Sequence, residues 1–316
     1  MDFGYACLSV LVKDASPAKT ATVKRLETLP DQEMVIDICR RAARTNLDNT
    51  RRLLFHNATN GLRLYRITPQ LVPLATHPIT RGWDWRSDLA EEFERTGLVA
   101  QDYGLRLSSH PGQYSVLNSR SENVVAAALA DLDYHAALHE MLHQGAGGRI
   151  VLHVGGGKGD KPAALERFRR NAARLSPVAR RRLTLENDDV TFGTGDVLPF
   201  CESLGLPMVL DIHHHLLNPA GLELQDALPR IFATWPQGER PKIHVSSPKD
   251  ERNRRAHADY VNPRQFRAFL QLAAETGAGD FDVMVEAKQK DAAALRLAAD
   301  LGITLERIYP HSAATV

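Results

Sequence analysis

The sequence predicts a single-domain α/β fold, a parallel (β/α)8 barrel of the TIM type. Eight short aliphatic and β-branched runs recur along the chain, segments with helical periodicity separate most of them, and 316 residues suffice for one such barrel. A doubly wound open sheet is the competing arrangement. Against it, no GxGxxG motif follows the first apolar run, and we find no GxxxxGK(S/T) motif, so we also expect no nucleotide cofactor.

The eight expected strands are short apolar runs that end in polar residues. They span residues 4–12, 62–67, 105–110, 149–153, 182–186, 207–211, 242–245 and 282–286. Helical periodicity is present in residues 33–56, 123–142, 162–175, 196–204, 224–232 and 263–275. No internal repeat or low-complexity linker divides the chain. We therefore expect one barrel domain over residues 1–305 and a C-terminal tail over residues 306–316.

The composition indicates a globular protein of a reducing compartment. Hydrophobic residues make up 43% and charged residues 24% of the chain. With 39 Lys and Arg against 38 Asp and Glu, non-specific coating of nucleic acid is disfavoured, whereas a local basic groove is allowed. No apolar run approaches the roughly 20 residues of a membrane span. We therefore expect no membrane partner. Cys7, Cys39 and Cys201 form no CxxC pair, so we expect no disulfide framework and a cytoplasmic location.

Ligand-type side chains stand at or near the ends of most expected strands. In a parallel barrel these ends converge on one face, where the active site lies. Buried carboxylates there would cost several kcal/mol unless cations compensate them, and mixed His, Asp and Glu donors suit zinc or manganese. Two or three divalent ions would suit phosphoryl chemistry. The residues are His77, His110, His153, Glu186, Asp211, His244 and Glu286.

Two further groups of histidines have different expected roles. The run of histidines at 213–215 follows Asp211, and one or two of them could bind metal while the others cap or pack. His135, His139 and His143 share one helix face between the third and fourth strands. That position belongs to the outer helical ring, so we expect packing or solvent exposure for these three.

The loop after the third strand is a candidate probe of DNA. Pro111-Gly112 predicts a tight turn that would project Gln113 and Tyr114 beside the metal site. An exposed tyrosine there could wedge into a base stack, and Tyr5 of the first strand could add a second ring. Ordinary packing is the alternative for each of these side chains.

The segment after the seventh strand is basic and should lie on the same face of the barrel. It contains Lys249, Arg252, Arg254 and Arg255. Basic side chains beside a metal site can meet phosphates. An exposed, solvated loop is the alternative interpretation.

These motifs together resemble the UV damage endonuclease family over nearly the whole chain. The most specific segments are His110-Pro111-Gly112-Gln113-Tyr114 and Leu185-Glu186-Asn187-Asp188. The resemblance also rests on Gly4-Tyr5-Ala6-Cys7, Ala75-Thr76-His77-Pro78, Leu152-His153-Val154-Gly155-Gly156, Asp211 with His214-His215, Lys242-Ile243-His244, Ala256-His257-Ala258 and Val283-Met284-Val285-Glu286-Ala287-Lys288.

The resemblance implies a TIM barrel related to endonuclease IV and a cluster of divalent ions, with manganese the usual one. It implies nicking of the DNA backbone immediately 5′ to a UV photoproduct, which leaves a 3′-hydroxyl and a 5′-phosphate without ATP. The implied lesion-probing residues are Tyr5, Gln113 and Tyr114. The implied metal ligands are His77, His110, His153, Glu186, Asp211, His214, His244, His257 and Glu286.

The chain departs from the family pattern around the first cysteine. Ala6, Leu8 and Ser9 stand where relatives often have Pro, Glu and Asn. Elsewhere, Lys242 should face the same cavity as His244, where it could contact a phosphate or, as a neutral amine, be modified.

We therefore expect a metal-dependent DNA repair endonuclease that acts on double-stranded DNA with UV lesions. Glu186 is the candidate bridge between two ions, Lys242 a second catalytic candidate, and Arg252, Arg254 and Arg255 candidate phosphate contacts. Mn²⁺ is the expected ion, with Zn²⁺ or Mg²⁺ as alternatives. We expect a monomer that associates with the nucleoid when it acts. The alternatives are an abasic-site endonuclease of the endonuclease IV type, a metal-dependent sugar isomerase on the same barrel, and a non-catalytic metal- or DNA-binding protein.

Overall fold

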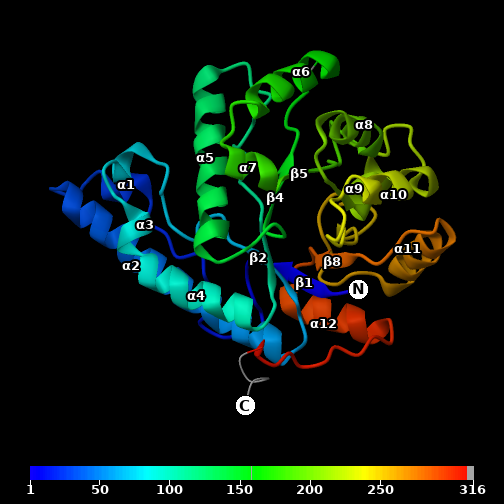
Figure 1. Ribbon diagram of the computed structural model, residues 1–316, viewed down its shortest axis with the longest axis horizontal. Coiled ribbons are helices and arrows are strands. Elements are labelled where there is room, and N and C mark those ends of the chain that lie inside the picture. Colours follow the sequence, from blue (N-terminus) through cyan, green and yellow to red (C-terminus); the bar gives the residue numbers. More distant parts are fainter. Residues whose placement is uncertain (158, 312–316) are drawn as a thin grey trace.

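The structure, a computed structural model, is a closed barrel of eight parallel strands in the order β1 to β8, with helices around it (Figure 1). It describes residues 1–157 and 159–311. The strands are β1 (Phe3–Ala6), β2 (Leu64–Ile67), β3 (Arg106–Ser109), β4 (Arg149–His153), β5 (Leu183–Glu186), β6 (Met208–Asp211), β7 (Lys242–Val245) and β8 (Asp282–Val285). The single-domain (β/α)8 barrel predicted from the sequence is confirmed.

The helices connect successive strands. They are α1 (Val23–Leu26), α2 (Gln32–Thr59), η1 (Pro78–Thr80), α3 (Trp85–Asp88), α4 (Ala90–Asp102), α5 (Glu122–Met141), α6 (Lys161–Ala172), α7 (Pro177–Arg182), α8 (Thr194–Leu204), α9 (Ile212–Leu217), α10 (Leu224–Ala233), α11 (Pro263–Glu275) and α12 (Lys290–Asp300). Within the described part of the chain, none of them has the length and apolar character that crossing a membrane would require.

The first strand is shorter than the sequence predicts. It ends at Ala6, because Cys7 has a φ of 63°, outside the extended region, and so turns the chain away from the sheet. The Tyr65 hydroxyl donates to the Cys7 carbonyl at 2.6 Å and fixes this bend. The predicted residues 8–12 therefore form the start of a loop at the C-terminal end of β1.

Two of the longer helices, α4 and α12, were not predicted, and neither were the short helices α1, α3, α7 and α9. The buried face of α4 contains Thr96 and Gly97 beside Phe93, so polar and small residues interrupt its apolar stripe. Gly97 is needed for close packing, since a Cβ there would lie 2.9 Å from the Leu142 carbonyl carbon. The buried face of α12 consists largely of alanines, which give a weak hydrophobic signal.

Charged residues occupy both ends of the barrel interior. On β3, β4 and β8, a charged residue at the first strand position is followed four residues later by a ligand-type residue. The pairs are Arg106 and His110, Arg149 and His153, and Asp282 and Glu286. Side chains four apart on a strand share a face, and Arg106 Nη1 donates to Asp282 Oδ2 across the barrel at 2.8 Å. Both side chains of each pair therefore point into the barrel.

At the N-terminal end of the barrel, an indole ring packs against two guanidinium groups. The Trp235 ring centroid lies 5.5 Å from Arg106 Cζ and 5.8 Å from Arg149 Cζ. Glu239 Oε1 accepts from Arg106 Nη2 and from Arg149 Nε, both at 2.8 Å. Cation–π contacts and charge-assisted hydrogen bonds offset the desolvation of these arginines. The ligand-type residues at the opposite end therefore lie above a layer of paired charges.

Part of the expected C-terminal tail packs on the barrel. Ile308 is buried, and its N–H donates to the Ala58 carbonyl of α2 at 2.8 Å. Residues 306–311 therefore cover the end of α2, whereas residues 312–316 lie outside the described residues.

We predict that Glu239→Gln lowers the free energy of unfolding by about 3 kcal/mol, because it removes the charge that compensates two largely buried guanidinium groups. Urea unfolding at pH 7 measures the change. The matched control is Glu202→Gln, which breaks an exposed pair with Arg230 and should cost less than about 1 kcal/mol. Equal stability of the two variants would contradict the role of Glu239.

Candidate active site

Glu186 is the centre of the site. It ends β5 inside the barrel and is almost completely buried. Its Oε2 lies 3.0 Å from His110 Nε2 and 3.5 Å from His153 Nε2. Its Oε1 lies 2.7 Å from His244 Nδ1 and 4.0 Å from His214 Nδ1. Each carboxylate oxygen therefore faces its own pair of imidazoles.

Two groups of donors could hold metal ions, and they share Glu186. Within each group, one donor atom per residue lies within 4.8 Å of the others. The first group is His110, His153 and Glu186, and the second is Glu186, Asp211, His244 and Glu286. The structure thus brings together six of the residues that the strand ends indicated.

Asp211 connects β6 to the short helix α9 that carries His214. Its Oδ1 accepts the His214 N–H at 2.8 Å and so caps the helix. The Asn187 side chain donates to the Asp211 carbonyl and accepts the Asp211 N–H, both at 2.9 Å. This side chain continues the pairing of β5 with β6 beyond Glu186. It therefore fixes the relative positions of the Glu186 and Asp211 carboxylates.

The three consecutive histidines in helix α9, which follows β6, point in different directions and have different partners. His214 faces both carboxylates, since its Nδ1 lies 4.0 Å from Glu186 Oε1 and 3.8 Å from Asp211 Oδ2. The His213 ring packs edge to face on the His257 ring, with centroids 5.7 Å apart. His215 Nδ1 lies 2.8 Å from Thr194 Oγ1. The geometry favours His214 as the ligand among the three.

Backbone carbonyls orient two of the imidazoles. His110 Nδ1 lies 3.0 Å from the Pro111 carbonyl, and His214 Nδ1 lies 2.9 Å from the Asn187 carbonyl. A carbonyl oxygen only accepts, so Nδ1 donates in both rings, and Nε2 is the nitrogen that a bound cation would take in place of a proton. This arrangement is typical of metal-binding histidines.

Burial and neighbouring charges shift the pKa values of the buried groups in opposite directions. Burial raises the pKa of the Glu186 carboxyl, but the imidazoles of His244 and His153 outweigh this effect and hold that pKa well below its usual range. Burial raises the pKa of Asp211 to about 7 against the attraction of His214. Burial lowers the pKa of His214, whereas the Asp211 and Glu186 carboxylates raise it, to about 9 overall. The cluster therefore favours positive charge among its carboxylates.

The donors fit divalent cations. Asp211 Oδ2 is buried and accepts no hydrogen bond from any residue that the structure describes, so it offers an acceptor to a cation. Three carboxylates converge with imidazole nitrogens at one end of the barrel. A mixed set of oxygen and nitrogen donors suits Mn²⁺ or Zn²⁺.

Arg66 and Asn187 are part of the site although the sequence analysis gave them no role. Arg66, on β2, donates to Glu286 Oε1, and its Nη2 lies 2.9 Å from His244 Nε2. Burial lowers the pKa of the Arg66 guanidinium, but Glu286 and Glu186 outweigh this effect and raise it overall. A charged residue within the apolar run of β2 was the available signal for Arg66. For Asn187, the signal was its position directly after Glu186.

His77, His214 and His257 lie outside the two donor groups found among the described residues. His77 caps η1, and its Nδ1 accepts the Ile79 N–H at 3.1 Å. His257 packs against His213, and its backbone pairs with that of Pro248. Their role as ligands stays a prediction.

Lys242 lies deeper in the barrel than expected for a phosphate contact. It is buried in β7, and its Nζ has no hydrogen-bond partner among the described residues. Burial and the neighbouring Arg106 lower its pKa well below the usual range, which favours the neutral amine. The burial of the amine disfavours a direct phosphate contact, and its catalytic role stays a prediction.

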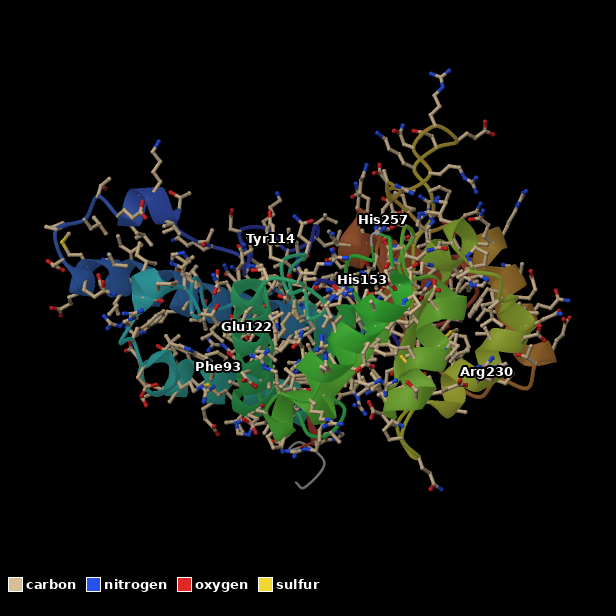
Figure 2. The ribbon with its side chains drawn as sticks, turned by 90° about the horizontal axis from the view of Figure 1, so that it is seen from above. Phe93, Tyr114, Glu122, His153, Arg230 and His257 are labelled. Atoms are coloured by element: carbon tan, nitrogen blue, oxygen red, sulfur yellow. The ribbon has the colours of Figure 1, made fainter. Side chains whose placement is uncertain are left out.

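Gln113 and Tyr114 form the tip of a turn beside the donor cluster. The Ser115 N–H donates to the Gly112 carbonyl at 3.0 Å, so these two residues are the centre of the turn. The Ser115 hydroxyl donates to Asp131 of α5 and anchors the turn. Tyr114 is 81% exposed and lies on the same side of the molecule as His153 (Figure 2).

The basic segment after β7 is a projecting hairpin. The Lys249 N–H donates to the Ala256 carbonyl at 2.7 Å and closes its base. The segment beside His257 stands out above the rest of the molecule (Figure 2). Arg252 and Arg254 are exposed, and Arg255 Nε lies 3.3 Å from Asp189 Oδ2 in the loop after β5.

Tyr5 is not placed to contact DNA. Its side chain is fully buried on the outer side of β1, where its ring centroid lies 5.4 Å from that of Tyr65. Side chains alternate along a strand, so Tyr5 points toward the helices while Gly4 and Ala6 point into the barrel. We correct the expectation of a second probing ring accordingly.

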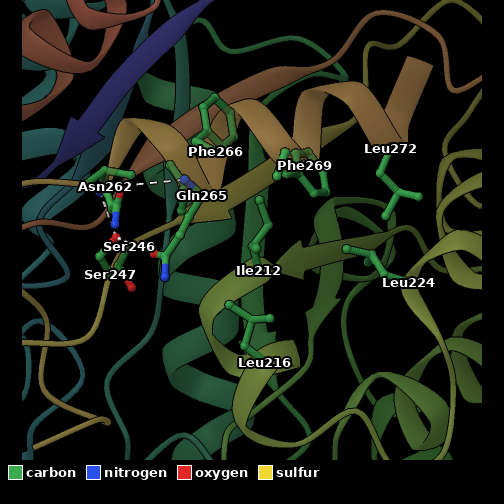
Figure 3. A pocket seen from close by; sticks show the side chains of 13 residues that line it. Ile212, Leu216, Leu224, Ser246, Ser247, Asn262, Gln265, Phe266, Phe269 and Leu272 are labelled. Atoms are coloured by element: carbon green, nitrogen blue, oxygen red, sulfur yellow. Dashed lines mark hydrogen bonds between the residues drawn. The ribbon is translucent and has the colours of Figure 1, made fainter. Parts of the chain in front are cut away.

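One cavity of the structure is apolar and lies apart from the donor cluster, and another adjoins the cluster. A cavity of about 320 Å³ lies outside the barrel between β7 and α11, lined by Phe266 and Phe269 with Ser246 and Ser247 at one end (Figure 3). It contains none of the donor residues. Another cavity of about 320 Å³ adjoins the cluster and is lined by His110, His153 and the Gln113 turn.

Comparison with known proteins identifies close relatives. A family model described as UV-endonuclease UvdE matches residues 1–315. A UV DNA damage endonuclease of Bacillus velezensis is 40% identical over 301 residues, covering 95% of this chain and 93% of the relative. One from Halalkalibacterium halodurans is 38% identical over 302 residues, covering 95% and 94%.

Solved structures agree with this result. The crystal structure of SacUVDE matches with a TM-score of 0.84 at 30% identity, covering 96% of this chain and 98% of that one. The 3-keto-D-glucoside 4-epimerase YcjR from E. coli matches with a TM-score of 0.54 at 13% identity, covering 96% and 99%, which shows a common fold alone. The chain therefore belongs to the UV DNA damage endonuclease family, whose members are DNA repair endonucleases on a TIM barrel.

Proposed function

We propose that this endonuclease hydrolyses the DNA backbone immediately 5′ to UV photoproducts, with divalent ions held around Glu186, and leaves a 3′-hydroxyl and a 5′-phosphate. The observation that carries the proposal is that the two oxygens of Glu186 face separate sets of donors. Bound divalent ions would activate water and stabilise charge that develops on the phosphoryl oxygens. We propose two or three Mn²⁺ per chain, with Zn²⁺ or Mg²⁺ as alternatives.

The chain's own residues prepare the donors. The Pro111 carbonyl accepts the Nδ1 proton of His110 and so directs its Nε2 toward Glu186, and the Asn187 carbonyl orients the ring of His214. Arg66 fixes one oxygen of Glu286 and leaves the other available. Lys242 would provide a neutral amine below His244 as a second catalytic group.

Outside the two groups, His77 and His257 remain proposed ligands because they match the family's motifs. Both are partly exposed and lie on segments that follow strands of the barrel, His77 after β2 and His257 after β7. They could therefore complete the coordination of an ion at the edge of the cluster.

The proposed substrate is double-stranded DNA that contains a UV lesion. Gln113 and Tyr114 would enter the duplex where damaged nucleotides leave it, because such nucleotides stack and pair poorly. Arg252, Arg254 and Arg255 would contact phosphates. We further propose that the protein acts as a monomer in the cytoplasm, at the nucleoid.

Two alternatives differ in substrate. The exposed Gln113 turn and the projecting basic hairpin argue against a closed pocket for a sugar. An abasic-site endonuclease is the nearer alternative, since it would use the same kind of metal cluster on DNA.

Plasmid nicking tests the proposal. We expect UV-irradiated supercoiled plasmid to be nicked with Mn²⁺ and to stay intact with chelator, while unirradiated plasmid stays intact in both. Faster nicking of depurinated than of irradiated plasmid would instead assign an abasic-site enzyme. Aldose turnover without nicking would assign an isomerase.

We predict that Glu186→Gln folds but loses bound metal and roughly 100-fold or more of the nicking rate, since each 1.4 kcal/mol of lost stabilisation is tenfold. Elemental analysis and nicking rates measure both losses. Glu122→Gln, at an exposed site on α5, is the control. A Glu186 variant that keeps a tenth of the wild-type rate would rule out a bridging carboxylate.

We predict that replacing Arg252, Arg254 and Arg255 by Ala reduces the slope of log affinity against log salt by about 2 to 3, because each lost phosphate contact removes nearly one released counterion. Fluorescence anisotropy at several salt concentrations gives the slope. The control replaces the exposed helical residues Arg41, Arg95 and Arg230, which removes the same charge. Equal slopes for the two variants would show that the arginines of the hairpin make no phosphate contacts.

We predict that Gln113→Ala/Tyr114→Ala weakens binding to lesion-bearing duplex by roughly 10- to 1000-fold, because stacking by a tyrosine is lost. Binding to undamaged duplex should change much less, and the metal content should stay unchanged. Tyr309→Ala removes an exposed tyrosine elsewhere and is the control. An unchanged ratio of affinities with collapsed turnover would assign the pair to chemistry.

A further inference from the structure

His213 is a buried polar side chain of α9 that the proposed metal chemistry does not use. Only 2% of its surface is exposed. Its Nε2 is buried and makes no hydrogen bond to any residue that the structure describes. A buried ring nitrogen without a partner costs free energy, which a leucine of similar size would not cost. A purely structural role therefore explains this histidine poorly.

The ring of His213 contacts the C-terminal arm of the basic hairpin, which spans residues 248–257. It packs edge to face on the His257 ring, with centroids 5.7 Å apart. Burial lowers the pKa of His213, as do the His257 and His214 imidazoles, whereas a hydrogen bond to the Arg254 carbonyl opposes these effects. The lowered pKa favours a neutral ring, which keeps one N–H for that carbonyl. One side chain therefore makes two contacts with the hairpin.

The backbone of His213 is fixed to the donor cluster. Asp211 Oδ1 caps α9 by accepting the His214 N–H at 2.8 Å. At the other end of this short helix, the Asn218 N–H donates to the His214 carbonyl, also at 2.8 Å. His213 lies between Asp211 and His214 in sequence, so it keeps a constant position relative to both. Its ring thus connects the donor cluster to the hairpin.

The rest of the hairpin has few contacts with the barrel. Residues 249–256 are all exposed, and the tip is ordered from within, since Asp250 Oδ1 accepts the N–H groups of Arg252 and Asn253 at 2.9 and 2.8 Å. Among the described residues, one ion pair joins this stretch to the barrel, between Arg255 and Asp189, and it is largely exposed on the arginine side. Exposed ion pairs stabilise little. The contact with His213 is therefore the buried one that sets the orientation of the hairpin.

We propose that His213 is a positioning residue for DNA binding, which holds the basic hairpin over the donor cluster so that Arg252 and Arg254 meet backbone phosphates while the scissile bond lies at Glu186. A hairpin that is already held in its binding orientation loses less conformational entropy when DNA binds. His213 acts through the hairpin and contacts neither ion nor DNA. The inference rests on the proposed function, because it assumes that these arginines contact DNA.

The test uses the full-length, Mn²⁺-loaded protein and a duplex with one photoproduct. His213→Leu fills the same space without the hydrogen bond. It should reduce the slope of log affinity against log salt by about 1 to 2 and weaken binding roughly tenfold. KM should rise while kcat stays within about threefold of wild type, because binding and not chemistry is affected. The metal content and the free energy of unfolding in urea should not fall.

A second set of variants separates positioning from a structural role. When Arg252, Arg254 and Arg255 are already replaced by Ala, adding His213→Leu should change affinity by less than about twofold, because both changes act through the same contacts. His215→Leu is the matched control, since His215 is buried in the same helix but bonds Thr194, and it should leave the salt slope unchanged. His213→Met replaces the leucine variant if that variant does not fold.

Three results would overturn the inference. They are a wild-type salt slope in His213→Leu, a full additional loss of affinity when this change joins the three arginine substitutions, and a loss of bound metal. If the three arginine substitutions themselves leave the slope unchanged, or if the wild-type protein does not nick irradiated plasmid, the proposed function is wrong instead. The two failures are therefore distinguishable.

Discussion

The contact of the buried Glu186 carboxylate with an imidazole pair on each oxygen is the interaction on which the rest of the site depends. It exists because β3, β4, β5 and β7 end at the same rim, so that side chains distant in sequence meet inside one barrel. Burial alone would protonate such a carboxyl, and its low pKa shows that positive charge nearby prevails. For Asp211, the attraction of His214 does not fully offset burial, and the pKa is raised to about 7.

The two ends of the barrel play complementary parts. At the N-terminal end, Glu239 compensates Arg106 and Arg149, and Trp235 packs against both guanidinium groups. At the C-terminal end, the loops present exposed groups from fixed turns: Tyr114 is anchored through Ser115, and the β1 loop through Asp291. A rigid rim around a charged interior suits a rigid polyanionic substrate such as a duplex.

The sequence predicted the barrel and most of the donors, because hydrophobic runs with polar ends are a local signal and parallel strands bring their ends together. It failed where the outcome depends on backbone conformation or on a partner far away. The positive φ of Cys7 shortened β1, and alternation along that strand buried Tyr5. Arg66 was not predicted because its contacts are with His244 and Glu286, which are far from it in sequence. The different directions of the three consecutive histidines depend on the helical turn capped by Asp211, which the sequence did not reveal.

Anomalous diffraction from crystals soaked in Mn²⁺ tests the central claim most directly. The account predicts at least two separate peaks, one within coordination distance of each Glu186 oxygen, with the first beside His110 and His153 and the second beside Asp211, His244 and Glu286. A single peak bound to one oxygen, or strong peaks that avoid Glu186, would contradict it.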